Sequence, residues 1–438
     1  MSSDSMIDVP LQAAELRDAW PALSWEERLE GFHRLVHAEA DDFFLDLPVP
    51  DQAALLLELP PPERRLWIRL LAPDDAADVI QRVPDEERPR LLELLDPSSR
   101  REVTALLAYA EDAAGGLMSP RFARLRPEMT ADEAILYLRR QAREAETIYY
   151  AYVLDSDQRL VGVVSFRDLL TAPPEQRIAD LMRREVVSVP DTLDQEAVAR
   201  VMTRAGLNAI PVVDSQGRMQ GIVTVDDVVD VVQEEATEDI QKIGGMEALD
   251  GPYLDTGFGA MVKKRAGWLA ALFIGEMFTA TAMAGFEDEI ARAVVLALFV
   301  PLIISSGGNS GSQASTLVIR AMALGEVSIR DAFRVARREI FSGLALGAIL
   351  AGIGAIRIFA WQGIFGTYGP RTPSIALTVA ISLVLVVTWG TLMGAMLPML
   401  IRRLGFDPAS ASAPFIATLV DVSGIVIYFT AAHFVLRI

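Results

Sequence analysis

Five long apolar segments in the C-terminal part of the chain place the strongest constraint on its fold. They lie at residues 267–286, 291–322, 339–361, 374–401 and 412–436. An α-helix of about 20 predominantly apolar residues spans the hydrocarbon core of a bilayer. We therefore expect residues 263–438 to form an α-helical membrane domain of five transmembrane helices.

The charges that flank these segments predict their orientation. Basic clusters precede the first segment and follow the second and the fourth: Lys263, Lys264, Arg265, Arg320, Arg330, Arg334, Arg337, Arg338, Arg402 and Arg403. The loop after the first segment holds three acids and Arg292, and the loop after the third holds Arg371 as its one charged residue. Basic loops stay in the cytoplasm, so the N-terminal half is expected there, and the C-terminus outside. We expect a multi-pass protein of the cell's inner (plasma) membrane.

Charge is divided unevenly between the two halves of the chain. Residues 1–262 carry 26 basic and 50 acidic side chains, whereas the residues from Lys263 onward carry 14 and 9. An acidic soluble half joined to an apolar half attracts cations and is not the pattern of a nucleic-acid-binding protein. The expected partners are the lipid bilayer and cations, with no nucleic acid.

The chain has no cysteine and only three histidines, which restricts its metal and catalytic chemistry. Thiolate sites are excluded, and the histidines do not form a ligand cluster. Any metal must be bound by oxygen atoms, which suit Mg²⁺, Ca²⁺ or Mn²⁺. Neither a nucleophile–base set nor the GxxxxGK[ST] motif is present, so we do not expect an enzyme.

Residues 1–125 have the pattern of short helices separated by proline. The stretch 55–95 has apolar residues at helical spacing, and its runs end near Pro60, Pro73, Pro84 and Pro97. Proline begins or ends helices, and a spacing of about a dozen residues predicts a helical array. We expect an all-α superhelical N-domain in the cytoplasm.

Residues 126–239 contain an internal repeat. The segment AYVLDSDQRLVGVVSFRDLL (151–170) aligns without gaps on IPVVDSQGRMQGIVTVDDVV (210–229), and each copy predicts two strands followed by a helix. This doubling resembles a tandem CBS domain, an α/β pair that commonly binds adenine nucleotides between its copies. On that pattern Tyr150, Arg167 and Asp168 are placed to stack a base and hold a ribose of ATP. The alternative to nucleotide binding is a structural role, in which Tyr150 is an aromatic side chain of a strand and Arg167 and Asp168 form an ion pair at the start of a helix.

Polar residues interrupt the second apolar segment, which reads PLIISSGGNSGSQASTLVIR (301–320). In lipid, a glycine-rich break is tolerated where it lines a cavity or packs against protein. Packing of small residues against another helix is one explanation. Asn309 and Gln313, one turn apart, favour the other: exposed carbonyls and two amides would offer oxygens to a hydrated cation.

Carboxylates stand in or beside the other segments. Asp421 lies about ten residues into the last segment, and an intramembrane carboxylate is by default a functional site. Its alternative role is an ion pair with Arg357 or another buried base. Asp407 stands at the cytoplasmic end, either at a pore entrance or as the N-cap of the last helix. Glu276 in the first segment could face the same pore or lie near a membrane interface.

A run of acids links the repeat to the membrane segments. It consists of Asp226, Asp227, Asp230, Glu234, Glu235, Glu238 and Asp239, and four pairs of them stand i,i+4. Like charges at that spacing destabilise a helix, and a divalent ion would convert the repulsion into attraction. The alternative is a solvated acidic face. Asp74, Asp75 and Asp78 in the N-domain are possible partners.

Four phrases in this order resemble the MgtE family of Mg²⁺ channels: EDAAGGLMSP (111–120), EEATEDIQKIGG (234–245), PLIISSGGNSGSQ (301–313) and DPASASAPFIATLVDVSG (407–424). The resemblance covers nearly the whole chain and implies a homodimer with the pore on the dimer axis. It implies that Asp421 of both subunits forms a selective ring, with the Ala417 carbonyl one turn earlier and Asp407 near the entrance. It also implies a connecting plug helix over 240–262. Asn309 belongs to the same polar region of the pore.

The resemblance further implies the gating ligands. Acids of the linker and the N-domain would bind cytoplasmic Mg²⁺ when these domains close: Asp227, Asp230, Glu235, Glu238, Asp239, Asp74 and Asp78. The expected function is a Mg²⁺-selective channel that imports the hydrated ion down its electrochemical gradient, is closed by internal Mg²⁺ and is modulated by ATP. A coupled carrier or exporter of Mg²⁺ or Co²⁺, and a nucleotide-reading membrane sensor, remain as alternatives.

Overall fold

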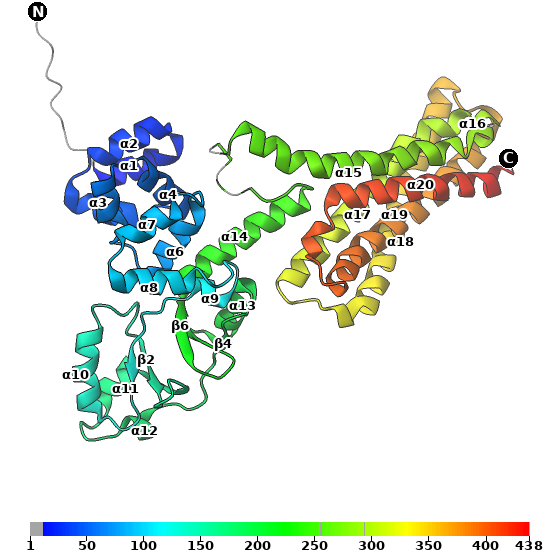
Figure 1. Cartoon of the computed structure of the whole chain (residues 1–438). Helices are drawn as coiled ribbons and strands as arrows, with labels where there is room; N and C mark the ends of the chain where they lie inside the picture. The colour runs from blue at the N-terminus through cyan, green and yellow to red at the C-terminus, as the bar shows by residue number, and fades with distance from the viewer. Residues whose placement is uncertain (1–11, 250, 252, 255, 293, 438) are drawn as a thin grey trace, which may run out of the picture. The chain divides into compact units, whose positions relative to one another are not determined.

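The computed structural model describes residues 12–249, 251, 253, 254, 256–292 and 294–437 (Figure 1). Its chain divides into two compact units, Met1–Glu234 and Glu235–Ile438.

The first unit begins with short helices that pack around aromatic side chains. They are α1 (Ala13–Ala19), η1 (Trp20–Ala22), α2 (Trp25–His33), α3 (His37–Leu45), α4 (Val49–Glu58), α5 (Pro61–Ile68), α6 (Pro73–Arg82), α7 (Arg88–Leu94) and α8 (Pro97–Leu106). Proline stands at the first or second position of α4 through α8, where a missing backbone N–H breaks no helical hydrogen bond. Phe32 contacts both Phe43 and Trp67 in the core. The expected all-α N-domain is confirmed.

Two small sheets of the same design follow, in the orders β1-β2-β3 and β4-β5-β6. Their elements are α9 (Ala114–Leu117), β1 (Arg124–Leu125), α10 (Ala131–Gln141), β2 (Tyr150–Leu154), β3 (Leu160–Ser165), α11 (Phe166–Thr171), α12 (Ile178–Leu181), β4 (Val189–Pro190), α13 (Gln195–Ala205), β5 (Ala209–Val213) and β6 (Met219–Thr224). In each sheet the first pair is parallel and the second antiparallel, with a register shift at the same place. The predicted α/β repeat is confirmed.

Helix α14 (Val225–Ile243) follows β6 and ends at a pair of glycines. Gly245 has φ +76°, in the left-handed region that favours glycine, and a Cβ there would lie 2.9 Å from the Trp268 ring. The expectation of one plug helix over 240–262 is therefore wrong. The end of α14 and the start of α15 (Phe258–Ala284) share that range and are separated by non-helical chain, within which residues 250, 252 and 255 lie outside the described residues.

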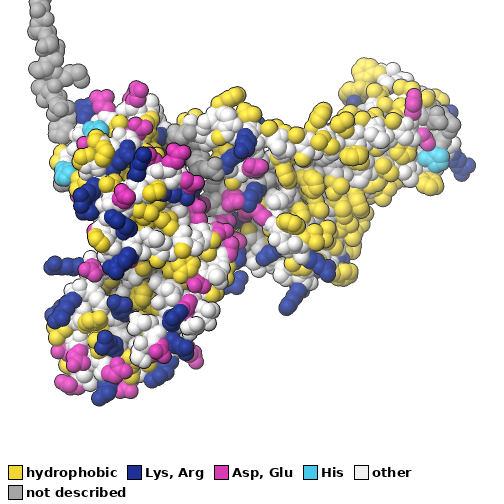
Figure 2. All heavy atoms as spheres, in the orientation of Figure 1, with side chains coloured by type: hydrophobic (Ala, Val, Ile, Leu, Met, Phe, Trp, Pro, Cys, Tyr) yellow, Lys and Arg dark blue, Asp and Glu magenta, His cyan; other side chains and the backbone are white. Residues whose placement is uncertain are grey.

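The described part of the second unit holds five helices long and apolar enough to cross a membrane, as predicted. Its elements after α15 are α16 (Glu287–Arg292), η2 (Val294–Phe299), α17 (Val300–Ala323), η3 (Ile329–Asp331), α18 (Ala332–Phe365), η4 (Gly369–Arg371), α19 (Thr372–Arg403), η5 (Pro408–Ser410) and α20 (Ala413–Leu436). Figure 2 shows apolar side chains gathered over this unit, as lipid contact requires.

The glycine-rich sequence does not break the second span. Helix α17 is continuous from Val300 to Ala323, so its carbonyls accept helical hydrogen bonds and the expected exposed carbonyls are wrong. The glycines serve close packing instead. A Cβ on Gly390 would lie 2.4 Å from the carbonyl oxygen of Gly307, and one on Gly394 would lie 2.1 Å from that of Gly311. Only glycine allows α17 and α19 to approach so closely.

Candidate functional site

Asp421 lies on α20 where that helix meets α17. Two α17 hydroxyls hold the start of α20: Ser312 donates to the carbonyl of Ala413 at 3.1 Å, and Ser315 donates to that of Ala411 at 3.0 Å. Farther along, a Cβ built on Gly308 would lie 3.4 Å from both Asp421 Oδ1 and the Ala417 Cβ atom. The half-buried Asp421 and Ala417 therefore line the same side of α20, against a glycine of α17.

Asn309 and Gln313 occupy the exposed side of α17, whereas Gly307, Gly308 and Gly311 are buried. The Asn309 amide lies 3.4 Å from the Ser305 hydroxyl. Packing of small residues thus explains the glycines, but it does not involve the two amides. Asn309 directly follows the glycine that contacts Asp421, so its polar side chain lies on the neighbouring side of the helix.

The alternative partner of Asp421 lies elsewhere. The Arg357 guanidinium stacks on Trp361, with its carbon 5.0 Å from the ring centroid. Among the residues that the structure describes, no ion pair includes Asp421. The proposed pairing of Asp421 with Arg357 is therefore not found.

Asp407 caps the short helix η5, where it accepts a hydrogen bond from the Ala409 N–H at 2.8 Å. The N-cap of the last helix is Ser412, whose hydroxyl accepts from the Phe415 N–H at 3.3 Å. The suggestion that Asp407 caps the last helix is therefore wrong. The intervening turn, Pro408–Ser410, separates the two caps.

Asp407 also binds a lysine that the sequence analysis missed. Lys242 Nζ lies 2.6 Å from Asp407 Oδ2 and forms a second ion pair with Glu238, one turn earlier on α14. Burial lowers the pKa of Lys242, but hydrogen bonds and charges of the two carboxylates outweigh it and hold the pKa above its ordinary value. Lys242 is the one basic residue of the acidic helix α14. A single basic side chain among acids was the sequence signal that could have identified this contact.

Apolar packing supports the same contact. Ile243 packs on a small cluster of buried side chains formed by Ile319 of α17, Ala409 and Ala411. The last turn of α14 is thereby fixed to the ends of the membrane helices by one ion-pair network and one hydrophobic contact. Glu235 and Asp239, the other predicted sensor residues of this unit, lie on the same helix.

The remaining sensor residues come together in the first unit. Asp74, Asp75 and Asp78 of α6 interact electrostatically with Asp227 at the start of α14. Burial, followed by the charge of Asp75, raises the pKa of Asp78 to about 8. Burial raises that of Asp227 to about 7, although the Thr224 hydroxyl opposes it by donating a hydrogen bond at 2.6 Å. Burial, with a weaker contribution from Asp226, also raises the pKa of Asp230.

Asp74 is the most constrained of these acids. Its side chain is 7% exposed, its Oδ1 has no hydrogen-bond partner, and burial raises its pKa well above the ordinary value. A buried carboxylate oxygen without a donor favours a proton or a cation. In the described part of the chain, however, no three His, Asp or Glu side chains lie close enough together to chelate a metal.

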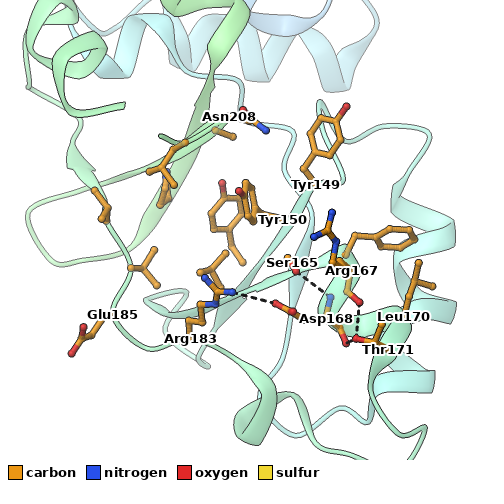
Figure 3. A pocket seen from close by; sticks show the side chains of 18 residues that line it. Tyr149, Tyr150, Ser165, Arg167, Asp168, Leu170, Thr171, Arg183, Glu185 and Asn208 are labelled. Atoms are coloured by element: carbon orange, nitrogen blue, oxygen red, sulfur yellow. Dashed lines mark hydrogen bonds and ion pairs between the residues drawn. The ribbon is translucent and has the colours of Figure 1, made fainter. Parts of the chain in front are cut away.

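A cavity of about 810 Å³ lies between the two copies of the repeat (Figure 3). Tyr150, Arg167 and Asp168 all line it, as the resemblance implied. The Ser165 hydroxyl caps α11 by accepting from the Asp168 N–H at 3.1 Å, which fixes this carboxylate at the helix start. The volume of the cavity is typical of a site for one small organic ligand.

Further lining residues were not predicted. Arg183 reaches toward Asp168, with 3.9 Å between Nη2 and Oδ2, and Asn208 comes from the second copy (Figure 3). Asn208 lies just before the repeated segment 210–229, so the repeat gave no signal for it. Nothing in the sequence marked Arg183, which lies outside the repeated segment.

Comparisons with known proteins agree with this organisation. The MgtE family, described as divalent cation transporters, matches residues 300–431, the MgtE intracellular N domain matches 11–112, and CBS domains match 114–175 and 178–234. The chain is 43% identical over 426 residues to the magnesium transporter MgtE of Thermus thermophilus, covering 97% of this chain and 93% of that one. The Bacillus subtilis magnesium transporter MgtE is 34% identical over 82% of this chain and 77% of its own. The cytosolic domain of the Mg²⁺ channel MgtE, solved with ATP, shares 45% identity over 50% of this chain and 90% of that chain, with a TM-score of 0.48.

The buried acids predict a pH-dependent stability. Because the folded pKa values of Asp78 and Asp227 lie above the unfolded value, the folded state binds more protons, and stability is lost as pH rises from about 4 to about 8. Without divalent ions, we expect the first unit of the purified chain to lose about 3–4 kcal/mol between pH 6 and pH 8. Thermal unfolding at constant ionic strength measures this.

Asp78→Asn should reduce this pH dependence, whereas Asp132→Asn, at an exposed acid of α10, should not. Added Mg²⁺ should stabilise the protein more at pH 8 than at pH 6, because protons compete for the same oxygens. If stability changes equally with pH in the Asp78→Asn and Asp132→Asn variants, these buried acids do not titrate as described.

Proposed function

The chain belongs to the MgtE family of magnesium transporters, and from this premise we propose that it is a Mg²⁺-selective channel of the plasma membrane that imports the hydrated ion. Asp421 is the observation that carries the proposal. It is a carboxylate inside an apolar helix, against a glycine of α17, and no ion pair within the described residues neutralises it. Such a charge is expensive in lipid and is expected to face water.

The ion path follows from the chemistry of these groups. Mg²⁺ gives up its octahedral water shell reluctantly, so a pore binds it through those waters. Asp421 supplies charge, the Ala417 carbonyl and the Asn309 amide supply further oxygens, and Asp407 concentrates cations at the cytoplasmic end. We propose a homodimer in which Asp421 of both subunits faces one ion, which would double the charge at that depth.

Internal Mg²⁺ is proposed to close the channel through two groups of acids. In the first unit, Asp227 repels Asp74 and Asp78, and Asp226 repels Asp230. A divalent ion would neutralise that repulsion. Glu235, Glu238 and Asp239 form the second group on α14. The contact of Lys242 with Asp407 supports α14 as the closing element, because it holds the end of that helix against the membrane helices.

ATP is the proposed ligand of the cavity in the repeat. Tyr150 offers a ring for stacking, Asp168 an acceptor for ribose hydroxyls, and Arg167 and Arg183 positive charge for phosphates. Binding there would stabilise one arrangement of the two copies, and it would modulate gating only by its differential affinity for open and closed forms.

Asp421→Ala should abolish Mg²⁺ flux into proteoliposomes while the protein remains folded and dimeric, because the pore loses its only deep carboxylate in α20. Glu326→Gln, at an exposed acid in the loop after α17, serves as the control. Growth of a strain deficient in Mg²⁺ uptake gives a second readout. Wild-type growth with the Asp421 variant would refute the pore assignment. Single-molecule conductance separates a channel from a coupled carrier.

Neutralising Glu235, Glu238 and Asp239 together should make flux less sensitive to internal Mg²⁺. Protease cleavage near 240–262 should be slowed by Mg²⁺ in the wild type, but not by Na⁺ at equal ionic strength, and the triple variant should lose this protection. Neutralising three exposed acids of the first unit, Asp132, Glu144 and Glu175, is the control, because it removes the same charge and leaves α14 unchanged. A triple variant that keeps full protection would locate the sensor among the aspartates of the first unit.

The full chain should bind ATP in calorimetry, and Asp168→Ala should weaken binding about tenfold, because a ribose hydroxyl loses a charged acceptor. Asp180→Ala provides the control, since Asp180 is exposed on α12 and does not line the cavity. Absence of heat with ATP at two temperatures, for the wild type, would reject the nucleotide proposal.

A further inference from the structure

Helices α15 and α20 run parallel and in register along their shared contact. The Trp268 indole N–H donates to the Ser412 hydroxyl at 3.1 Å near the cytoplasmic start of both spans. At the other end, Phe286 stacks on Phe429 with 5.2 Å between ring centroids. Between them, a Cβ on Gly275 would lie 2.9 Å from the Thr418 side chain. These three contacts fix which residues of the two helices lie at the same depth.

This register places Glu276 beside Asp421. Glu276 is one residue beyond Gly275, and Asp421 is three beyond Thr418, so the two differ in depth by about 3 Å at a rise of 1.5 Å per residue. The two helices touch at Gly275 and Thr418. Because the helices are parallel, turns of about 100° from Gly275 to Glu276 and about 300° from Thr418 to Asp421 direct both side chains to the same side of this contact. Both carboxylates therefore lie at one level of the membrane unit, about two to three turns from the cytoplasmic start of their apolar segments.

The position of Glu276 on α15 argues against a lipid-facing or purely structural role. Gly275 and the buried Thr279 face the rest of the unit, and Glu276 lies about 60–100° from them around the helix, at the edge of the packed face. Among the described residues, no ion pair includes Glu276, although its side chain is exposed. A charge at mid-span that no base neutralises requires water.

We propose that Glu276 is a second carboxylate of the ion path, which acts with Asp421 to select divalent over monovalent cations. The proposal rests on the pore function assigned to Asp421 above. Two carboxylates at one depth raise the local negative potential, and the attraction of a divalent ion grows twice as fast with that potential as that of Na⁺ or K⁺. Glu276 thereby sets specificity, while Asp421 is required for Mg²⁺ to pass at all.

The absence of cysteine from the chain permits a direct test of water access. In a Glu276→Cys variant, a small, charged, membrane-impermeant methanethiosulfonate reagent should react with the single thiol, and Mg²⁺ should slow the reaction. Ile274→Cys is the matched control, because Ile274 is exposed, lies about 160° around the same helix from Glu276 and should stay unlabelled. Equal labelling of the two variants, or a thiol at position 276 that never reacts, would overturn the proposal.

A functional test uses Glu276→Gln, which keeps the shape and removes the charge, with Glu326→Gln in the exposed loop after α17 as control. In proteoliposomes, Glu276→Gln should lower the permeability of Mg²⁺ relative to Na⁺ about tenfold, and Glu276→Asp should restore part of it. Unchanged selectivity in Glu276→Gln, with Asp421→Asn inactive, would reject Glu276 and keep the pore. Wild-type flux in both variants would reject the pore itself.

Discussion

The membrane unit depends on the close approach of α17 and α19 at their glycines. Where Gly390 and Gly394 meet the carbonyls of Gly307 and Gly311, there is no room for a Cβ atom on either helix. Because lipid offers no hydrophobic drive for helix association, such backbone contact is what holds spans together. It also directs the rest of α17, since a helix packed by its glycines on α19 turns Gly308 toward α20.

This geometry explains how an apolar helix can carry a carboxylate. Asp421 lies opposite a residue without a side chain, so no side chain at position 308 stands between the carboxylate and the backbone of α17. A larger residue at position 308 would lie between them. On α17, tight packing and polarity thus occupy different sides: Gly307 and Gly311 meet α19, whereas Asn309 and Gln313 are exposed.

The sequence predicted the parts of the fold that depend on local pattern. Apolar length was sufficient for the five spans, and the gapless repeat was sufficient for the paired sheets. The glycines of α17 were misinterpreted as a break because their purpose appears only beside Gly390 and Gly394, which are about 80 residues away by the sequence numbering. Similarly, the ion pair of Lys242 with Asp407 joins residues 165 positions apart. The periodicity of apolar residues does not predict a contact between such distant residues. The depth of Glu276 relative to Asp421 likewise became known only from the register in which α15 packs on α20.

Lys242 has a consequence for how the cytoplasmic end of the membrane unit responds to ions. Its ammonium group is attached to the chain, so its local concentration at Asp407 is fixed by geometry and does not change with the composition of the cell. A dissolved cation that approaches Asp407 therefore competes with an ammonium group that belongs to the same chain. The cation concentration needed to displace Lys242 from Asp407 is set by the length and packing of the end of α14. Mutations at that helix end would therefore change this concentration.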